Sequence, residues 1–109
     1  MNRNKNDLIA EIKTARDEAR VKTNAYKYLT AKRYDYWRAR AASTTYDEVL
    51  TMFARGTELY IPDMAVKALA HFDLVRDDDT SETILAFADG RRDALATVAE
   101  WMRNEKSNR

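Results

Sequence analysis

Glycine and proline are almost missing from this chain, and that shortage limits the folds that it can adopt. The only glycines are Gly56 and Gly90, the only proline is Pro62, and the first 55 residues contain neither type. A sheet-rich fold needs many tight turns, which depend on these two residue types. Seventeen alanines add strong helix propensity. The sequence therefore predicts an all-α protein made of long helices.

The supply of large aliphatic side chains is small. Leu, Ile, Val and Phe together make up 20 of the 109 residues, a share close to that of disordered chains. A net charge of only +1, together with six Tyr, four Met and two Trp, opposes disorder, because aromatic rings bury large areas. We expect about one domain's worth of folded chain with a modest core.

Composition excludes several classes of protein. Cysteine is absent, which excludes disulfides, thiolate catalysis and zinc–cysteine sites. No apolar run approaches the roughly 18 residues of a transmembrane helix. Asp7, Glu11 and Lys13 interrupt any signal-peptide stretch after the basic start. We therefore expect a protein that is neither secreted nor membrane-spanning.

The N-terminal part of the chain carries a helical seam. Its positions are three and four residues apart: Leu8, Ile12, Ala15, Ala19, Lys22, Tyr26, Leu29, Arg33, Tyr36 and Arg40. The pattern predicts one long helix over residues 7–42, capped by Asn6 and spanning roughly 50 Å. Only five of the 20 Leu, Ile, Val and Phe residues lie in residues 1–43. Such a helix is expected to need a partner, either copies of itself or another molecule.

Three shorter helices are expected after a break at residues 41–44. Thr45 and Glu48 form a capping box for the first of them, with Val49, Met52 and Phe53 on its apolar face. Gly56 then ends this helix in the left-handed conformation.

Pro62 suits the first turn of the next helix, and Thr80 or Ser81 caps the last one after an acidic loop at 77–79. The residues expected to face inward from these two helices are Val66, Leu69, Ala70, Leu74, Ile84, Phe87, Ala88, Leu95, Val98 and Met102. The architecture expected is a long basic helix in residues 1–43, acting as an assembly element, followed by a compact three-helix unit in residues 44–109.

Charge and aromatic residues are concentrated in the N-terminal part. Residues 1–43 carry a net charge of +6 and residues 44–109 carry −5. This polarity suits intrachain docking, head-to-tail assembly or an external anionic partner. Residues 26–40 combine four Tyr and one Trp with five Lys or Arg and a single acid.

Three interpretations of residues 26–40 compete. Tyr, Trp and Arg are the residues that buried protein interfaces favour. The same mixture contacts phosphates and stacks on unpaired bases. Alternatively, the aromatic rings pack on the C-terminal unit while the basic groups stay in solvent. The candidate partner-binding residues are Tyr26, Lys32, Arg33, Tyr36, Trp37 and Arg40, together with Arg91 and Arg92.

No combination of residues has the spacing of a metal or catalytic site. His71 is followed by Asp73 and by three successive Asp at 77–79, a pattern typical of a solvated turn and unlike an EF-hand. The lone His has no Ser or Cys nucleophile beside it in a recognisable motif. We expect no metal, no cofactor and no enzymatic activity.

Gly90 precedes two arginines inside the last helix. A glycine in mid-helix indicates close approach of another backbone or a local break. Arg91 lies on the expected inward stripe, so its guanidinium needs an acid. The acids of residues 77–82, Asp93 and a partner molecule are the candidates for that role.

Residues 86–92, Ala-Phe-Ala-Asp-Gly-Arg-Arg, are followed by Leu95, Val98, Trp101 and Met102. This segment resembles a family of small tailed-bacteriophage proteins, in which an Ala-Phe-x-x-Gly-Arg-Arg motif leads into an amphipathic helix. Residues 66–74 are similar to the short helix before that motif, so the resemblance covers about residues 66–102. Members usually carry a Gly and an aliphatic pair after the double Arg, where this chain has Asp93-Ala94. The resemblance implies a phage-encoded accessory or virion-associated protein rather than an enzyme.

We therefore expect a non-enzymatic structural or accessory protein of bacteriophage type, located in the virion or the host cytoplasm. It would act through protein–protein assembly, as a homo-oligomer or as part of a larger assembly. A nucleic-acid-binding protein that uses the basic segment and an inhibitor of a host protein are the alternatives that these residues leave open.

Overall fold

A computed structural model of the chain describes residues 4–77 and 81–107, with the side chains of 105–107 left out. Four α-helices make up most of this part: α1 (Lys5–Tyr26), α2 (Arg33–Arg55), α3 (Ile61–Asp77) and α4 (Glu82–Ser107). Two single turns of 3₁₀ helix, η1 (Thr30–Lys32) and η2 (Glu58–Tyr60), precede α2 and α3. The described residues contain no strand, so the all-α fold expected from the sequence is confirmed.

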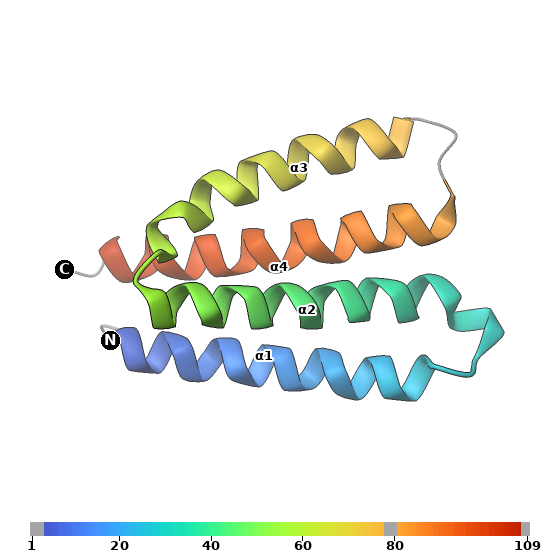
Figure 1. Cartoon of the computed structure of the whole chain (residues 1–109), viewed down its shortest axis with the longest axis horizontal. Coiled ribbons are helices and arrows are strands. Elements are labelled where there is room, and N and C mark those ends of the chain that lie inside the picture. The colour runs from blue at the N-terminus through green and yellow to red at the C-terminus, as the bar shows by residue number, and fades with distance from the viewer. Residues whose placement is uncertain (1–3, 78–80, 108–109) are drawn as a thin grey trace.

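The four helices lie side by side in the order α1, α2, α4, α3 (Figure 1). The molecule measures 45 × 29 × 25 Å. At its centre α2 and α4 run parallel, while α1 lies antiparallel on the outer side of α2 and α3 lies antiparallel on the outer side of α4 (Figure 1). The α1–α2 turn, the end of α3 and the start of α4 therefore lie at the same end of the molecule.

The prediction of a single helix over residues 7–42 is wrong. The chain turns back after Tyr26, where the amide of Leu29 donates to the Tyr26 carbonyl at 3.0 Å and Leu29 is extended. Helix α2 then runs unbroken through residues 41–44, so the expected break and the Thr45 capping box are also wrong. Ala41, Ser43 and Thr45 are buried in mid-helix. These residues are small because other helices pack closely there, and the division at residue 43 falls inside α2.

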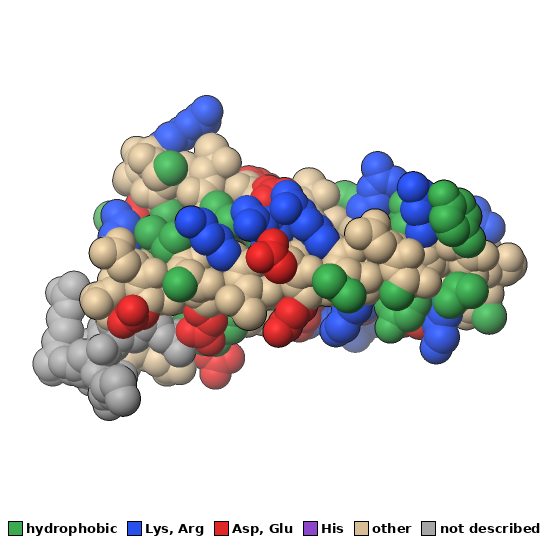
Figure 2. All heavy atoms as spheres, turned by 90° about the horizontal axis from the view of Figure 1, so that it is seen from below, with side chains coloured by type: hydrophobic (Ala, Val, Ile, Leu, Met, Phe, Trp, Pro, Cys, Tyr) green, Lys and Arg blue, Asp and Glu red, His purple; other side chains and the backbone are tan. Residues whose placement is uncertain are grey.

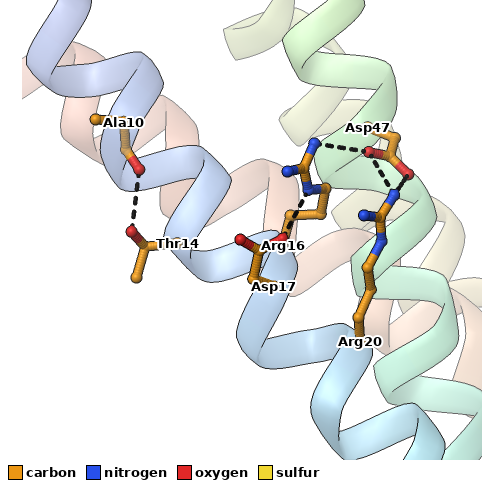
Figure 3. Close-up of polar contacts among 6 residues, drawn as sticks. All are labelled: Ala10, Thr14, Arg16, Asp17, Arg20 and Asp47. Carbon is orange, nitrogen blue, oxygen red and sulfur yellow. Dashed lines mark hydrogen bonds and ion pairs between the residues drawn. The ribbon is translucent and has the colours of Figure 1, made fainter.

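Helix α1 is held by its own chain. Leu8 and Ile12 are almost completely buried and belong to the main hydrophobic core. Arg16 and Arg20 extend from α1 toward Asp47 of α2, with N–O distances of 3.5 and 3.0 Å (Figure 3). The expectation that this segment lacks a partner within its own chain is therefore wrong. A few large apolar residues suffice to hold α1 against the rest of the chain, because only one face of this helix is covered.

The bulky part of the core lies at one end of the molecule. It is formed by the start of α1, the end of α2, the start of α3 and the end of α4, which meet at the end away from the α1–α2 turn (Figure 1). Its fully buried side chains are Leu8, Ile12, Val49, Ile61, Leu95 and Val98. The apolar face expected from Val49, Met52 and Phe53 is confirmed, with Met52 only partly buried.

Small residues allow α2 and α4 to approach closely at the centre. Ala41, Ala86 and Ala94 are completely buried. A Cβ placed on Gly90 would lie 2.2 Å from the carbonyl oxygen of Arg38. Gly90 therefore marks close approach of another backbone, and α4 continues through it without a break.

The prediction of which α3 residues face inward is wrong. Val66, Leu69, Ala70 and Leu74 are exposed, whereas the buried residues of α3 are Ile61, Ala65 and Ala68. Because α3 is the outermost helix and contacts mainly α4, one narrow face of small residues is enough. On α4 the inward positions 88, 95, 98 and 102 are confirmed, but Ile84 and Phe87 are exposed. The reason is visible in Figure 1, where α3 diverges from α4 toward the end of the molecule at which α4 begins.

The helix ends agree in part with the expected signals. Gly56 ends α2 with φ 75°, and Pro62 is the second residue of α3, both as expected. The Ser81 hydroxyl accepts from the Ile84 amide at 3.4 Å and so caps α4, while Thr80 lies outside the described residues. Helix α1 is capped by Asn4 and not by Asn6.

Gly90→Ala tests the close contact between α2 and α4. In an ordinary helix this change stabilises by about 1 kcal/mol. Here the added methyl meets backbone, so we expect destabilisation of about 1–3 kcal/mol in urea unfolding followed by circular dichroism. Ala96→Gly, at an exposed site on α4, is the control and should destabilise by about 1 kcal/mol through propensity alone. A stabilised Gly90→Ala variant would contradict the contact.

Ile12→Ala tests whether α1 is held within one molecule. Loss of this buried side chain should lower the free energy of unfolding by about 2–5 kcal/mol. Val21→Ala, on an exposed part of the same helix, should change it by less than about 0.5 kcal/mol. The effect of Ile12→Ala should not depend on protein concentration, and a strong dependence would mean that α1 packs on a neighbouring molecule.

Candidate functional site

The most distinctive surface lies where α1 turns into α2. A groove of about 450 Å³ opens there, which we call the aromatic–basic groove. Its lining residues come from the end of α1, the turn and the start of α2: Tyr26, Lys27, Tyr28, Leu29, Thr30, Arg33, Tyr36 and Trp37. It contains four aromatic rings and two cations, and none of the lining residues is acidic.

One wall of the groove is held in place by contacts within α2. The rings of Tyr36 and Trp37 meet edge to face with their centroids 5.1 Å apart. The Arg40 guanidinium lies 5.3 Å from the Trp37 ring and donates a hydrogen bond to the Tyr36 hydroxyl at 3.1 Å. Such edge-to-face and cation–π contacts restrict the two rings before any partner binds.

The other wall is exposed. Tyr28 is 85% exposed and Leu29 is 52% exposed, so these two neighbouring side chains add apolar area to the surface beside the groove. The Lys27 ammonium lies 5.5 Å from the Tyr28 ring. Figure 2 shows Lys and Arg side chains interleaved with hydrophobic ones over this end, while acidic side chains lie mainly over the middle of the face and toward the other end. This part of the surface combines apolar area with positive charge.

The structure brings together most of the residues that the sequence singled out. Tyr26, Arg33, Tyr36 and Trp37 line the groove, and Arg40 supports its wall. Lys32 lies beside it in η1, 3.8 Å from Asp35. Sequence analysis missed Lys27, Tyr28 and Leu29, because a continuous helix would spread these side chains around its surface.

Arg91 and Arg92 lie apart from the groove, on α4, and both contact acids of the same chain. Arg91 donates to Glu48 of α2 at 2.8 Å. Arg92 pairs with Asp89 one turn earlier, and its guanidinium lies 4.8 Å from the ring of Phe72 on α3. Of the acids predicted for Arg91, Asp77, Glu82 and Asp93 form no ion pair with it, and Asp78 and Asp79 lie outside the described residues. Parallel packing of α2 on α4 brings Glu48 within reach instead.

Asp89 is the centre of a polar cluster behind the groove. Its carboxylate accepts hydrogen bonds from the Tyr34 hydroxyl at 2.8 Å, from Arg38 Nε at 3.0 Å and from Arg92. Arg38 also forms an ion pair with Asp93 at 3.1 Å. Tyr34 and Arg38 are on α2, one turn from the groove residues, so the cluster links the start of α2 to α4.

The pKa values in this cluster follow from burial and hydrogen bonding. Burial alone would raise the pKa of Asp89, but the hydrogen bonds from Arg92, Tyr34 and Arg38 outweigh it and hold the pKa below its usual value. Burial, followed by the hydrogen bond to Asp89, raises the pKa of Tyr34 to about 12. At neutral pH the cluster therefore contains an ionised carboxylate and a neutral phenol.

A second cavity, of about 230 Å³, lies between α3 and α4. Met64, Lys67, Ala68, His71, Ala88 and Arg91 line it, so it contains one His and two cations without an acid or a hydroxyl nucleophile. Among the described residues no group of three His, Cys, Asp or Glu side chains could hold a metal ion. Asp78 and Asp79, which were considered with His71, lie outside the described residues.

Comparison with known proteins adds no identification. No family model matches the chain, and no match was found among curated proteins or among solved structures. In the described part of the chain, no helix has the length and apolar content needed to cross a membrane.

Asp89→Asn tests the cluster through its pH dependence. A lowered folded-state pKa means that Asp89 stabilises the fold above its unfolded pKa of about 3.9, and that this contribution is lost as the pH falls through the folded value. The variant should be less stable at pH 7 and should lose less stability on acidification below about pH 4. Asp63→Asn, at an exposed site on α3, is the matched control for thermal unfolding. Parallel pH curves for wild type and Asp89→Asn would contradict the assignment.

Proposed function

We propose that this protein is a non-enzymatic assembly protein that binds a partner protein through the aromatic–basic groove. The observation that supports this most is the groove's composition, with four aromatic rings and two cations on one exposed surface. Tyr, Trp and Arg dominate the binding energy of protein interfaces because they bury large areas with few rotatable bonds. The restrained Tyr36–Trp37 wall lowers the entropy lost on binding.

The chemistry of the described residues favours binding over catalysis. His71 lies in a cavity whose lining lacks an acid to orient it and a hydroxyl or thiol to activate. The most strongly coupled acid, Asp89, is surrounded by its own chain and serves to join α2 to α4. A binding role therefore accounts for the exposed groove, and the polar cluster has a structural role.

The resemblance of residues 66–102 to small tailed-bacteriophage proteins supports a biological setting for this function. The protein would then be a structural or accessory component in a virion or in the cytoplasm of an infected host. If the protein is an inhibitor of a host protein, it would likewise bind that protein through the groove.

The combined variant Tyr28→Ala/Arg33→Ala tests the groove. Both side chains are exposed, so thermal unfolding should be unchanged. Binding of the partner protein, whether another copy or a different protein, should weaken about 30-fold or more, as expected for loss of two interface side chains worth at least about 1 kcal/mol each.

Tyr60→Ala is the matched control, since Tyr60 is 66% exposed in η2 at the opposite end of the molecule. Binding should be measured by sedimentation velocity for self-association and by quantitative affinity capture for other proteins. Equal binding by wild type, Tyr28→Ala/Arg33→Ala and Tyr60→Ala would argue against the groove.

Single-stranded nucleic acid is a second candidate ligand, because the groove offers stacking surfaces beside Lys27 and Arg33 without an acidic lining residue. An oligonucleotide bound there should dissociate steeply between 50 and 200 mM salt, as counterion release requires. Fluorescence anisotropy with labelled single strands measures this directly. Binding that persists at high salt, or none at low salt, leaves a protein partner as the ligand.

A further inference from the structure

A second, oppositely charged surface lies at the same end of the molecule as the groove. It comprises the end of α3 and the start of α4, with the half-buried acid Asp73 and the exposed acids Asp77 and Glu82. Leu74 on α3 and Ile84 on α4, close to these acids in sequence, are 70% and 52% exposed. We call these five residues the acidic–apolar edge. Its mixture of negative charge and aliphatic area complements the positive charge and aromatic area of the groove.

The two surfaces are held in a fixed relation. Figure 1 shows the α1–α2 turn, the end of α3 and the start of α4 at one end of the molecule. The Tyr34–Asp89 and Arg38–Asp89 hydrogen bonds tie the start of α2 to the first turns of α4. One end face therefore presents a basic half beside an acidic half.

The charges on these two surfaces are only partly neutralised within the molecule, since the single cation Arg76 pairs with Asp73 at 3.4 Å and lies beside Asp77. The arginines of α1 and α2 that face the interior already have acids, as Arg16 and Arg20 do with Asp47. Lys27, Arg33 and Glu82 form no ion pair in the described part of the chain, and Asp77 only contacts the adjacent Arg76 at 3.8 Å. What remains after intrachain pairing is a positive and a negative surface on the same face.

We propose that two copies of this chain associate end to end about a twofold axis, the groove of each copy receiving the acidic–apolar edge of the other. This inference rests on the proposed function and names its partner protein. In a twofold interface each surface contacts its complement twice, so opposite charges on one face lead to a closed dimer. If the two surfaces lay at opposite ends, the same complementarity would produce an open chain of molecules.

The size of the end face is sufficient for such a dimer. The two shorter dimensions of the molecule, 29 and 25 Å, give a face of about 700 Å², which lies within the roughly 600–1,000 Å² per partner that standard-size interfaces bury. Tyr28 and Leu29 of one copy would cover Leu74 and Ile84 of the other. The exposed apolar residues of both surfaces would then be buried together with the opposite charges.

Charge reversal in two variants tests this arrangement. Lys27→Glu/Arg33→Glu reverses both charges of the groove, and Asp77→Lys/Glu82→Lys reverses two of the three negative charges of the acidic–apolar edge. Wild type should sediment as a dimer that weakens with rising salt. Each variant alone should dimerise at least about tenfold more weakly, because like charges then face each other. An equimolar mixture of the two should form a heterodimer, because an acidic face then meets a basic one.

Lys13→Glu and Glu100→Lys, at exposed positions away from this face, are the matched controls and should remain dimeric. Circular dichroism establishes that each variant is folded, and Leu74→Ser probes the same interface without a change in charge.

A dimer that is insensitive to the charge reversals, or a mixture of the two variants that stays monomeric, overturns the twofold arrangement. A monomeric wild type that still captures another protein in a Tyr28- and Arg33-dependent way overturns the second copy as partner but leaves the proposed function in place. A monomer that captures nothing overturns both.

Discussion

The close contact between α2 and α4 at Gly90 determines how the rest of the molecule is arranged. Because a Cβ at this position would lie 2.2 Å from the Arg38 carbonyl oxygen, only glycine allows the two backbones to come so near. The contact brings Asp89, the residue before Gly90, against Tyr34 and Arg38. It also leaves the outer sides of α2 and α4 free for α1 and α3. The parallel central pair, the polar cluster and the two flanking helices all follow from it.

The molecule uses different forces at its two ends. The large aliphatic residues gather at the end where α1 and α3 begin, and their burial supplies most of the stabilising free energy. At the other end the contacts between helices are hydrogen bonds and ion pairs around Asp89. Four large apolar residues of that end, Tyr28, Leu29, Leu74 and Ile84, are exposed. In a chain with so few aliphatic residues, this exposed apolar area supports the proposal that this end binds a partner.

The sequence predicted the helical fold from its composition and the end of α2 from Gly56, and it offered close approach of a backbone as one of two interpretations of Gly90. It could not predict the turn after Tyr26. Lys27, Tyr28 and Leu29 are all compatible with a helix, and the chain folds back there because Leu8 and Ile12 become buried against other helices. The inward face of α3 was assigned to Val66, Leu69 and Leu74 for a similar reason. The size of these side chains suggested that they are buried, whereas the close packing of α3 on α4 buries the smaller Ala65 and Ala68.

For the candidate site, the sequence by itself determined which side chains are available: a cluster of Tyr, Trp, Lys and Arg in residues 26–40 and an excess of acids after residue 43. Only the tertiary structure decided that Tyr26, Tyr28 and Trp37 line one groove, and that Arg38, Arg91 and Arg92 pair with acids of their own chain. Composition and short-range periodicity predict only the structure of the few residues around each position. The choice of contacts between helices depends on which packing buries the most apolar area while every buried charge keeps a partner.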